Sequence, residues 1–194
     1  MSSAFIPGDY FKRLATEEIF GENTPFEVDL GCGDGKFFRE IAQHYPERRF
    51  LAIERLLGRV RKVCKTCDRM GLQNTKVLRV ESAYAVEWLL PAESVSRLHL
   101  LCPDPWPKER HHKNRLVQEK FLNSLHKVLT EKGEFLFKTD HPEYFEWVMY
   151  KVQAHPGFQQ LDWKEDAFYY PKTDFQLQWE SQGLTLQQAR FVKI

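Results

Sequence analysis

Short runs of apolar residues alternate along the chain with longer stretches in which apolar positions recur every three or four residues. A short run of mainly apolar or alternating apolar residues is typical of a strand, and the three-to-four spacing is typical of a helix with one buried face. The runs predict strands near residues 26–30, 49–53, 76–80, 97–102 and 134–138. The spaced stretches predict helices near residues 35–45, 55–70, 83–90, 114–130 and 141–154. This alternation predicts an α/β fold with a mostly parallel sheet and helices on both faces.

The last part of the chain has a different pattern. Two further strands are predicted at residues 158–163 and 188–193, and the aromatic stretch at residues 168–171 between them reads as a loop. Polar side chains fall at the ends of the five earlier strands: Asp29, Glu54, Ser82, Asp104 and Asp140. Ligands of open α/β sheets lie outside the carboxyl ends of the strands, so these positions predict one common site.

A glycine-rich turn follows the first predicted strand. Gly31, Gly33 and Gly35 let the backbone take positive φ and approach a ligand closely. Asp29 precedes them, and Glu54 ends the next strand about twenty residues later, where a carboxylate can accept hydrogen bonds from ribose hydroxyls. Together these residues predict a nucleoside pocket that does not require a phosphate.

A proline-rich loop follows the predicted strand at residues 97–102. Three prolines within five residues force a rigid, extended loop that carries Asp104 and Trp106, and a run of cations leads from it into an amphipathic helix. An acid, an aromatic ring and cations together favour an anionic substrate that contains a base, which indicates nucleic acid. The alternative is a proline-rich turn before a solvated, basic helix start.

These residues also carry a family resemblance. Asp-Leu-Gly-Cys-Gly-Asp-Gly at residues 29–35, with Glu54, resembles the cofactor-binding half of class I S-adenosylmethionine-dependent methyltransferases. The string at residues 103–115, Pro-Asp-Pro-Trp-Pro-Lys-Glu-Arg-His-His-Lys-Asn-Arg, resembles that of the bacterial tRNA (guanine-N7-)-methyltransferases. Lys138-Thr139-Asp140 with Tyr144, and Thr173-Asp174-Phe175-Gln176 with Gly183, resemble two further motifs of that family.

The resemblance implies one class I methyltransferase (Rossmann-like) domain over residues 1–194, with an antiparallel C-terminal strand pair. It implies methyl transfer from S-adenosylmethionine to N7 of a guanosine in tRNA, at guanosine 46 of the variable loop. Asp29 and Gln176 stand where the family has Glu, and Ser82 stands where it has Asp. These departures keep two alternatives open: a methyltransferase with another RNA or a protein as substrate, and a non-catalytic RNA-binding relic.

The resemblance and the chemistry of the residues also assign roles. The residues expected to bind the cofactor are Asp29, Gly31, Gly33, Gly35, Glu54, Ser82 and Asp104. Asp104 is also the expected catalytic residue, which positions the guanine. The residues expected to contact the substrate are Lys108, Asp140, Thr173, Phe175 and Gln176, and those expected to contact phosphates are Arg110, Lys113 and Arg115.

Composition adds few constraints. The net charge of the 194-residue chain is +1, which excludes a uniformly basic protein, but cations concentrate at residues 55–69 and 104–115. Such patches fit phosphate binding, although the first also reads as a solvated helix face. The four cysteines form no metal pattern and predict reduced thiols. With no targeting segment or membrane-spanning run, we expect a cytoplasmic protein, monomeric or homodimeric, that binds tRNA and no metal.

Overall fold

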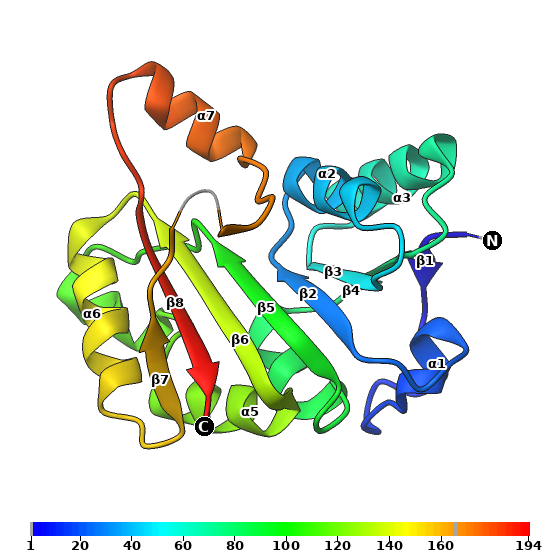
Figure 1. Cartoon of the computed structure of the whole chain (residues 1–194), viewed down its shortest axis with the longest axis horizontal. Helices are drawn as coiled ribbons and strands as arrows, with labels where there is room; N and C mark the ends of the chain where they lie inside the picture. The colour runs from blue at the N-terminus through cyan, green and yellow to red at the C-terminus, as the bar shows by residue number, and fades with distance from the viewer. Residues whose placement is uncertain (1, 165–166) are drawn as a thin grey trace.

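The computed structural model describes residues 2–164 and 167–194 and contains an eight-stranded, mostly parallel sheet (Figure 1). The strand order is β1-β4-β3-β2-β5-β6-β8-β7. Their bounds, in that order, are Ala4–Phe5, Thr75–Arg79, Phe50–Glu54, Phe26–Leu30, Val95–Leu101, Leu129–Thr139, Gln187–Lys193 and Phe158–Leu161. β8 pairs antiparallel with both β6 and β7, and the other pairs are parallel. The predicted α/β fold with an antiparallel C-terminal pair is confirmed.

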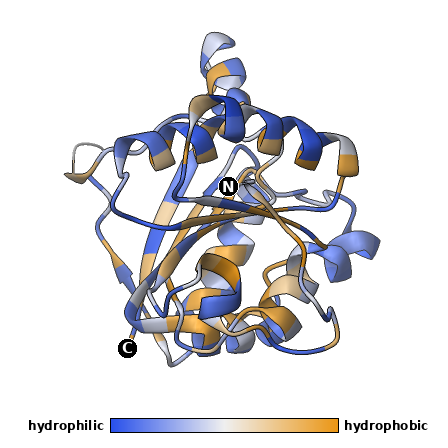
Figure 2. Ribbon diagram, turned by 90° about the vertical axis from the view of Figure 1, so that its right-hand side faces the viewer, coloured by the Kyte–Doolittle hydropathy of each residue, from blue (hydrophilic) through white to orange (hydrophobic). Residues whose placement is uncertain are grey.

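Helices cover both faces of the sheet, because each face carries its own apolar cluster. α2 (Lys36–His44) and α3 (Leu57–Met70) pack on Phe50, Ala52 and Val77. The other cluster joins Val28, Leu51 and Leu98 to α1, η1, α5 and α6, whose bounds are Thr16–Phe20, Ala85–Leu89, Glu119–Val128 and Pro142–Gln153. Hydrophobic positions accordingly gather in the strands and the inner sides of the helices (Figure 2).

Several boundaries differ from the prediction. The helix expected at residues 114–130 begins only at Glu119, after a 3-10 helix, η2 (Glu109–Asn114). It ends at Val128 because β6 starts at Leu129, five residues before the predicted strand. The helix expected at residues 83–90 is a short α4 (Ser82–Tyr84) followed by the π-helical η1. The sequence analysis did not predict β1, α1 or α7 (Asp174–Ser181).

The parallel strands bring the predicted polar positions to one edge. β2 and β3 lie side by side in register, so Asp29 near the end of β2 pairs with Ala52, and β3 ends at Glu54. β5 lies on the other side of β2 and leads into the proline-rich loop. α7 stands above these strand ends, at the top of Figure 1.

Candidate functional site

A cavity of about 950 Å³ lies at the carboxyl edge of the sheet. Its walls come from the glycine turn after β2, the end of β3, the start of α4, the loop after β5 and the start of α7. Of the predicted site residues it brings together Asp29, Gly31, Gly33, Gly35, Glu54, Ser82, Asp104, Lys113, Arg115, Thr173 and Phe175. Lys108, Arg110, Asp140 and Gln176 are not part of its lining.

The three glycines of the turn all have positive φ: +83° at Gly31, +56° at Gly33 and +72° at Gly35. A side chain would be strained at each of them. Gly35 is also tightly packed, since a Cβ there would lie 2.7 Å from Cγ2 of Val63 on α3. A Cβ on Gly33 would meet no described atom within 4 Å. Gly35 therefore lets α2 and α3 approach each other, whereas Gly33 keeps open space at the cavity.

We expect Gly35→Ala to lower the free energy of unfolding by about 2–4 kcal/mol, because backbone strain and the overlap with Val63 add. Gly33→Ala is the matched control, since it introduces the strain without the overlap and should cost only about 1–2 kcal/mol. Denaturant titration measures both. Equal losses in the two variants would contradict the packing role of Gly35.

Two buried carboxylates lie on the cavity wall. Asp29 and Glu54 are each 5% exposed. Glu54 accepts hydrogen bonds from the amides of Gly33 (3.2 Å) and Leu56 (2.8 Å), while Oδ2 of Asp29 is buried and has no hydrogen-bond partner among the described residues. Burial, and secondarily the charge of Glu54, raise the pKa of Asp29 to about 7. This acid pair suits a ligand that brings a positive charge and hydroxyl donors.

The raised pKa of Asp29 predicts how the site responds to pH. In the free protein Asp29 is mostly protonated at pH 6 and mostly ionised at pH 8. A cationic ligand group prefers the ionised form, so affinity for S-adenosylmethionine should fall as the pH drops through 7, approaching about tenfold per pH unit. Calorimetric Kd values from pH 5.5 to 8 measure this, and Asp29→Asn should flatten the profile. An equally steep profile in that variant would remove Asp29 from the ligand contacts.

Ser82 lies opposite the glycine turn, at the first position of α4. Its Oγ is 4.0 Å from the point that a Cβ on Gly31 would occupy. The neighbouring acid, Glu81, has another function, because its carboxylate accepts hydrogen bonds from the amides of Ala83 (3.0 Å) and Tyr84 (2.8 Å) and so caps the helix. The Ser82 hydroxyl therefore supplies the polar group that faces Gly31.

The loop after β5 presents Asp104 and Trp106 to the cavity. The backbone is strained on both sides of Asp104, since Cys102 has φ +49° and Trp106 has φ +44°. Non-glycine residues with positive φ gather at functional sites. The Asp104 side chain is exposed and makes no hydrogen bond to any other described residue, which leaves both carboxylate oxygens free for a ligand.

Arg115 does not have the surface position expected of a phosphate contact. It is 2% exposed, and its guanidinium donates to the Pro105 carbonyl and to Oε1 of Glu143, both at 2.9 Å. It also lies over the rings of Tyr144 and Trp147 on α6. Arg115 therefore ties the proline-rich loop to α6, and the expected phosphate contact is corrected to a structural one. Sequence alone could not separate this cation from its exposed neighbours.

The other expected contacts surround the cavity. Lys108, Arg110 and Lys113 are exposed, and Lys113 reaches the cavity wall. Asp140 is exposed at the end of β6, close enough to Cys102 to help burial raise the pKa of that thiol to about 12. The side-chain amide of Gln176 on α7 donates to Oε1 of Glu180 on the same helix at 2.9 Å, and its backbone amide donates to the Thr173 hydroxyl.

The cavity also contains residues that the sequence analysis left out of the site. Leu56 and Phe37 add apolar surface, and Arg59 and Lys120 add cations to the walls. Leu56 lies two residues after Glu54, and that position was the available signal. An apolar wall beside the acid pair suits an aromatic base.

Metal ligands, thiols and membrane spans are further features of the described residues. Within residues 2–164 and 167–194, no cluster of three or more His, Cys, Asp or Glu residues is arranged to hold a metal ion. All four cysteines have free thiols. No helix in the described ranges is long and apolar enough to cross a membrane.

Comparisons with known proteins identify the family of this chain. Residues 23–189 match the sequence profile of a family described as "Putative methyltransferase". The chain is 33% identical to the tRNA (guanine-N(7)-)-methyltransferase of Syntrophotalea carbinolica over 87% of this chain and 74% of that protein. It is 32% identical to the enzyme of the same name from Chlamydia caviae, over 97% of this chain and 88% of the relative.

Solved structures agree on the fold. The 16S rRNA methyltransferase KamB matches with a TM-score of 0.67 at 18% identity, over 91% of each chain. The aminoglycoside resistance methyltransferase NpmB1 matches with a TM-score of 0.64 at 17% identity, over 93% of this chain and 95% of the other. The methyltransferase fold, the strand-end cavity and the sequence identity to these relatives together show that the chain belongs to the family of tRNA (guanine-N(7)-)-methyltransferases.

Proposed function

We propose that this protein transfers the methyl group of S-adenosylmethionine to N7 of a guanosine in tRNA, at guanosine 46 of the variable loop. The observation that carries the proposal is the cavity that joins the Asp29–Glu54 acid pair to Asp104, in a chain of this family. Relatives from two bacteria carry this activity in their names, which supports tRNA as the substrate here.

The residues at the glycine turn fit S-adenosylmethionine. The unpartnered, buried Oδ2 of Asp29 would accept from the ammonium group, and Glu54 would accept from the ribose hydroxyls. The free space at Gly33 admits a ligand close to the backbone. When bound, the cofactor supplies a methyl group that its sulfonium already activates, so it carries the difficult part of the chemistry.

The remaining task is to hold the guanine. N7 has a free lone pair and carries no proton, so the enzyme needs no general base. Asp104 would accept hydrogen bonds from the guanine N1–H and the N2 amino group, which selects against adenine because adenine lacks both donors. Trp106 lines the same cavity and would stack on a base beside it. Alignment of the guanine with the methyl group can supply about 7–11 kcal/mol of the barrier reduction at best.

Exposed cations on two sides of the cavity would hold the tRNA backbone. Lys108, Arg110 and Lys113 follow Asp104. A second group of exposed cations consists of Arg55, which lines the cavity just before α3, and of Arg61, Lys65 and Arg69 on α3. No carboxylate in the described part of the chain forms an ion pair with any of those four. A neutral protein with cations around one site fits an anionic polymer.

We therefore expect tRNA affinity to fall steeply with salt. Lys113→Ala should reduce the slope of log K against log[salt] by about 0.7–0.9, because one phosphate contact is lost. Lys127→Ala, an exposed cation at the end of α5, is the matched control and should keep the parental slope. Filter binding from 50 to 200 mM salt covers the useful range. A parental slope near zero would show that the cations are only a solvated surface.

Incubation with labelled S-adenosylmethionine and pools of unmodified tRNA, mRNA and protein tests the proposal as a whole. We expect label in tRNA alone. Label in mRNA or protein would identify a methyltransferase with another substrate. A protein that binds tRNA but neither binds the cofactor nor transfers label would be an RNA-binding relic.

Free thiols at all four cysteines are compatible with the reducing cytoplasm, where we place the reaction.

A further inference from the structure

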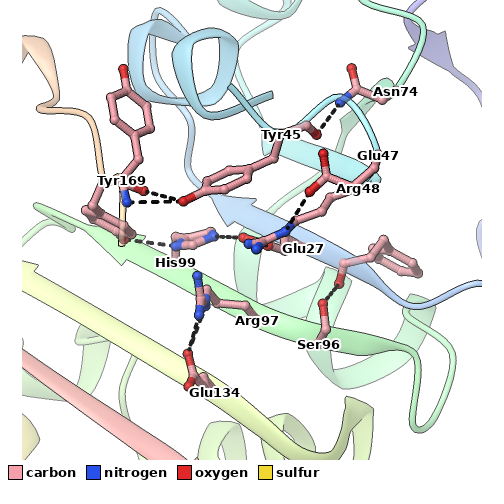
Figure 3. Close-up of polar contacts among 12 residues, drawn as sticks. Glu27, Tyr45, Glu47, Arg48, Asn74, Ser96, Arg97, His99, Glu134 and Tyr169 are labelled. Carbon is pink, nitrogen blue, oxygen red and sulfur yellow. Dashed lines mark hydrogen bonds and ion pairs between the residues drawn. The ribbon is translucent and has the colours of Figure 1, made fainter. Parts of the chain in front are cut away.

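A buried series of hydrogen-bonded polar side chains lies on the sheet next to the cavity. His99 on β5 is fully buried and lies between two partners (Figure 3). Its Nε2 is 2.9 Å from Oε2 of Glu27 on β2, and its Nδ1 is 2.9 Å from the hydroxyl of Tyr170. Glu27 is 3% exposed, and its second oxygen accepts from Arg48 at 3.0 Å. These hydrogen bonds therefore join β2 and β5 to the segment that precedes α7.

The charge states of Glu27 and His99 fix the direction of each hydrogen bond. Burial alone would raise the pKa of Glu27, but the hydrogen bond from His99 and the charges of Arg97 and Arg48 hold it below its usual value, so Glu27 is ionised. Burial lowers the pKa of His99, so its ring is neutral. An ionised carboxylate can only accept, so the single ring proton is on Nε2. Nδ1 is then an acceptor, and Tyr170 donates its hydroxyl proton to it.

Aromatic contacts hold the same segment at neighbouring points. The ring of Phe37, a cavity residue, is 4.8 Å from that of Tyr170 and 5.0 Å from that of His99. Tyr169 stacks on His44 of α2 at 3.9 Å, and its amide donates to the hydroxyl of Tyr45 at 3.1 Å. The Tyr169 ring hydroxyl takes no part in these contacts.

The segment leads directly into the substrate side of the cavity. Thr173, three residues after Tyr170, caps α7, and Thr173 and Phe175 line the cavity. α7 itself stands clear of the sheet (Figure 1), and its apolar residues Phe175 and Leu177 are 53% and 40% exposed. The position of Thr173 and Phe175 therefore depends on how the preceding chain is fixed.

We infer that Tyr170 is a positioning residue for methyl transfer: its hydrogen bond to the His99–Glu27 pair sets Thr173 and Phe175 against the bound guanosine. The inference rests on the proposed function for its substrate. The His99–Glu27 pair lies outside the cavity lining. Its role in this inference is to hold in place the part of the cavity wall that α7 contributes.

Tyr170→Phe tests this inference, because it removes the hydroxyl and keeps the ring that packs on Phe37. We expect kcat/KM for tRNA to fall by about tenfold, since Nδ1 of His99 loses its donor, while the Kd for S-adenosylmethionine changes by less than about twofold. Amides at residues 173–181 should exchange hydrogen faster than in the parent, and those of β2 and β5 should exchange at the parental rate. Tyr169→Phe, which removes a hydroxyl outside these contacts, is the matched control and should behave as the parent.

The outcomes separate cleanly. A parental kcat/KM in Tyr170→Phe overturns the inference, whether or not the exchange of α7 changes. Equal losses of cofactor affinity and kcat/KM also overturn it, because they indicate a general structural role. If the parent does not methylate tRNA, the proposed function fails on its own, while exchange at residues 173–181 still tests whether Tyr170 fixes α7. Parental exchange there overturns the inference.

Discussion

Asp104→Asn should reduce single-turnover formation of 7-methylguanosine by about 10- to 150-fold while cofactor binding stays near the parental level. The side chain keeps its shape, but one acceptor oxygen is replaced by an amide that faces the guanine's own donors. Loss of a hydrogen bond to a charged group costs about 1.5–3 kcal/mol, which corresponds to that range of rates. The free carboxylate oxygens of Asp104 at the cavity wall motivate this expectation.

Glu109→Gln is the matched control for this variant. Glu109 is an exposed acid five residues further along, at the start of η2, and it lies outside the cavity lining. The control should keep the parental rate, since it removes one negative charge from the same surface without touching the guanine. A near-parental rate for Asp104→Asn would return the proline-rich loop to a purely structural role.

Glu54→Ala should weaken S-adenosylmethionine binding by about 10- to 150-fold and leave tRNA affinity nearly unchanged. The variant loses the expected charge-assisted bonds to the ribose, worth about 1.5–3 kcal/mol, and it also frees the amides of Gly33 and Leu56 that the carboxylate now holds. Calorimetric titration with the cofactor measures the loss.

Two further variants make the result specific to the ribose contact. Glu54→Gln keeps an acceptor for one of the two amides and should bind the cofactor with intermediate affinity. Glu40→Ala removes a carboxylate of α2 whose one ion pair among the described residues is with Lys36, and its affinity should be parental. Unchanged cofactor affinity in Glu54→Ala would remove Glu54 from the ribose contacts.

The strands and the cofactor side of the cavity could be predicted from sequence because their signals are local. Three apolar residues alternate with two acids in the five residues before the glycine turn, which predicts a strand, and β2 occupies residues 26–30 as predicted. Parallel strands end at one edge, so the acids at their ends had to meet there. That reasoning placed Asp29 and Glu54 side by side, as the structure confirms.

The remaining features depend on contacts between distant residues. Nothing in the string at residues 103–115 distinguishes Arg115, which is buried against α6, from the exposed Lys113. His99 reads as one polar position in an apolar run, and only the fold reveals that Glu27 and Tyr170 lie on either side of it. α7 carries no strong apolar face, so periodicity gave no signal, although Thr173 has the character of a helix cap.

Single-turnover reaction with labelled S-adenosylmethionine and an unmodified tRNA, followed by nucleoside analysis, tests the central claim most directly. A second tRNA carrying adenosine at position 46 tests the target position. The account predicts label in 7-methylguanosine alone, in the first tRNA and not in the second. Label in any other nucleoside would contradict it. So would the absence of labelled tRNA when the protein binds both the cofactor and the tRNA.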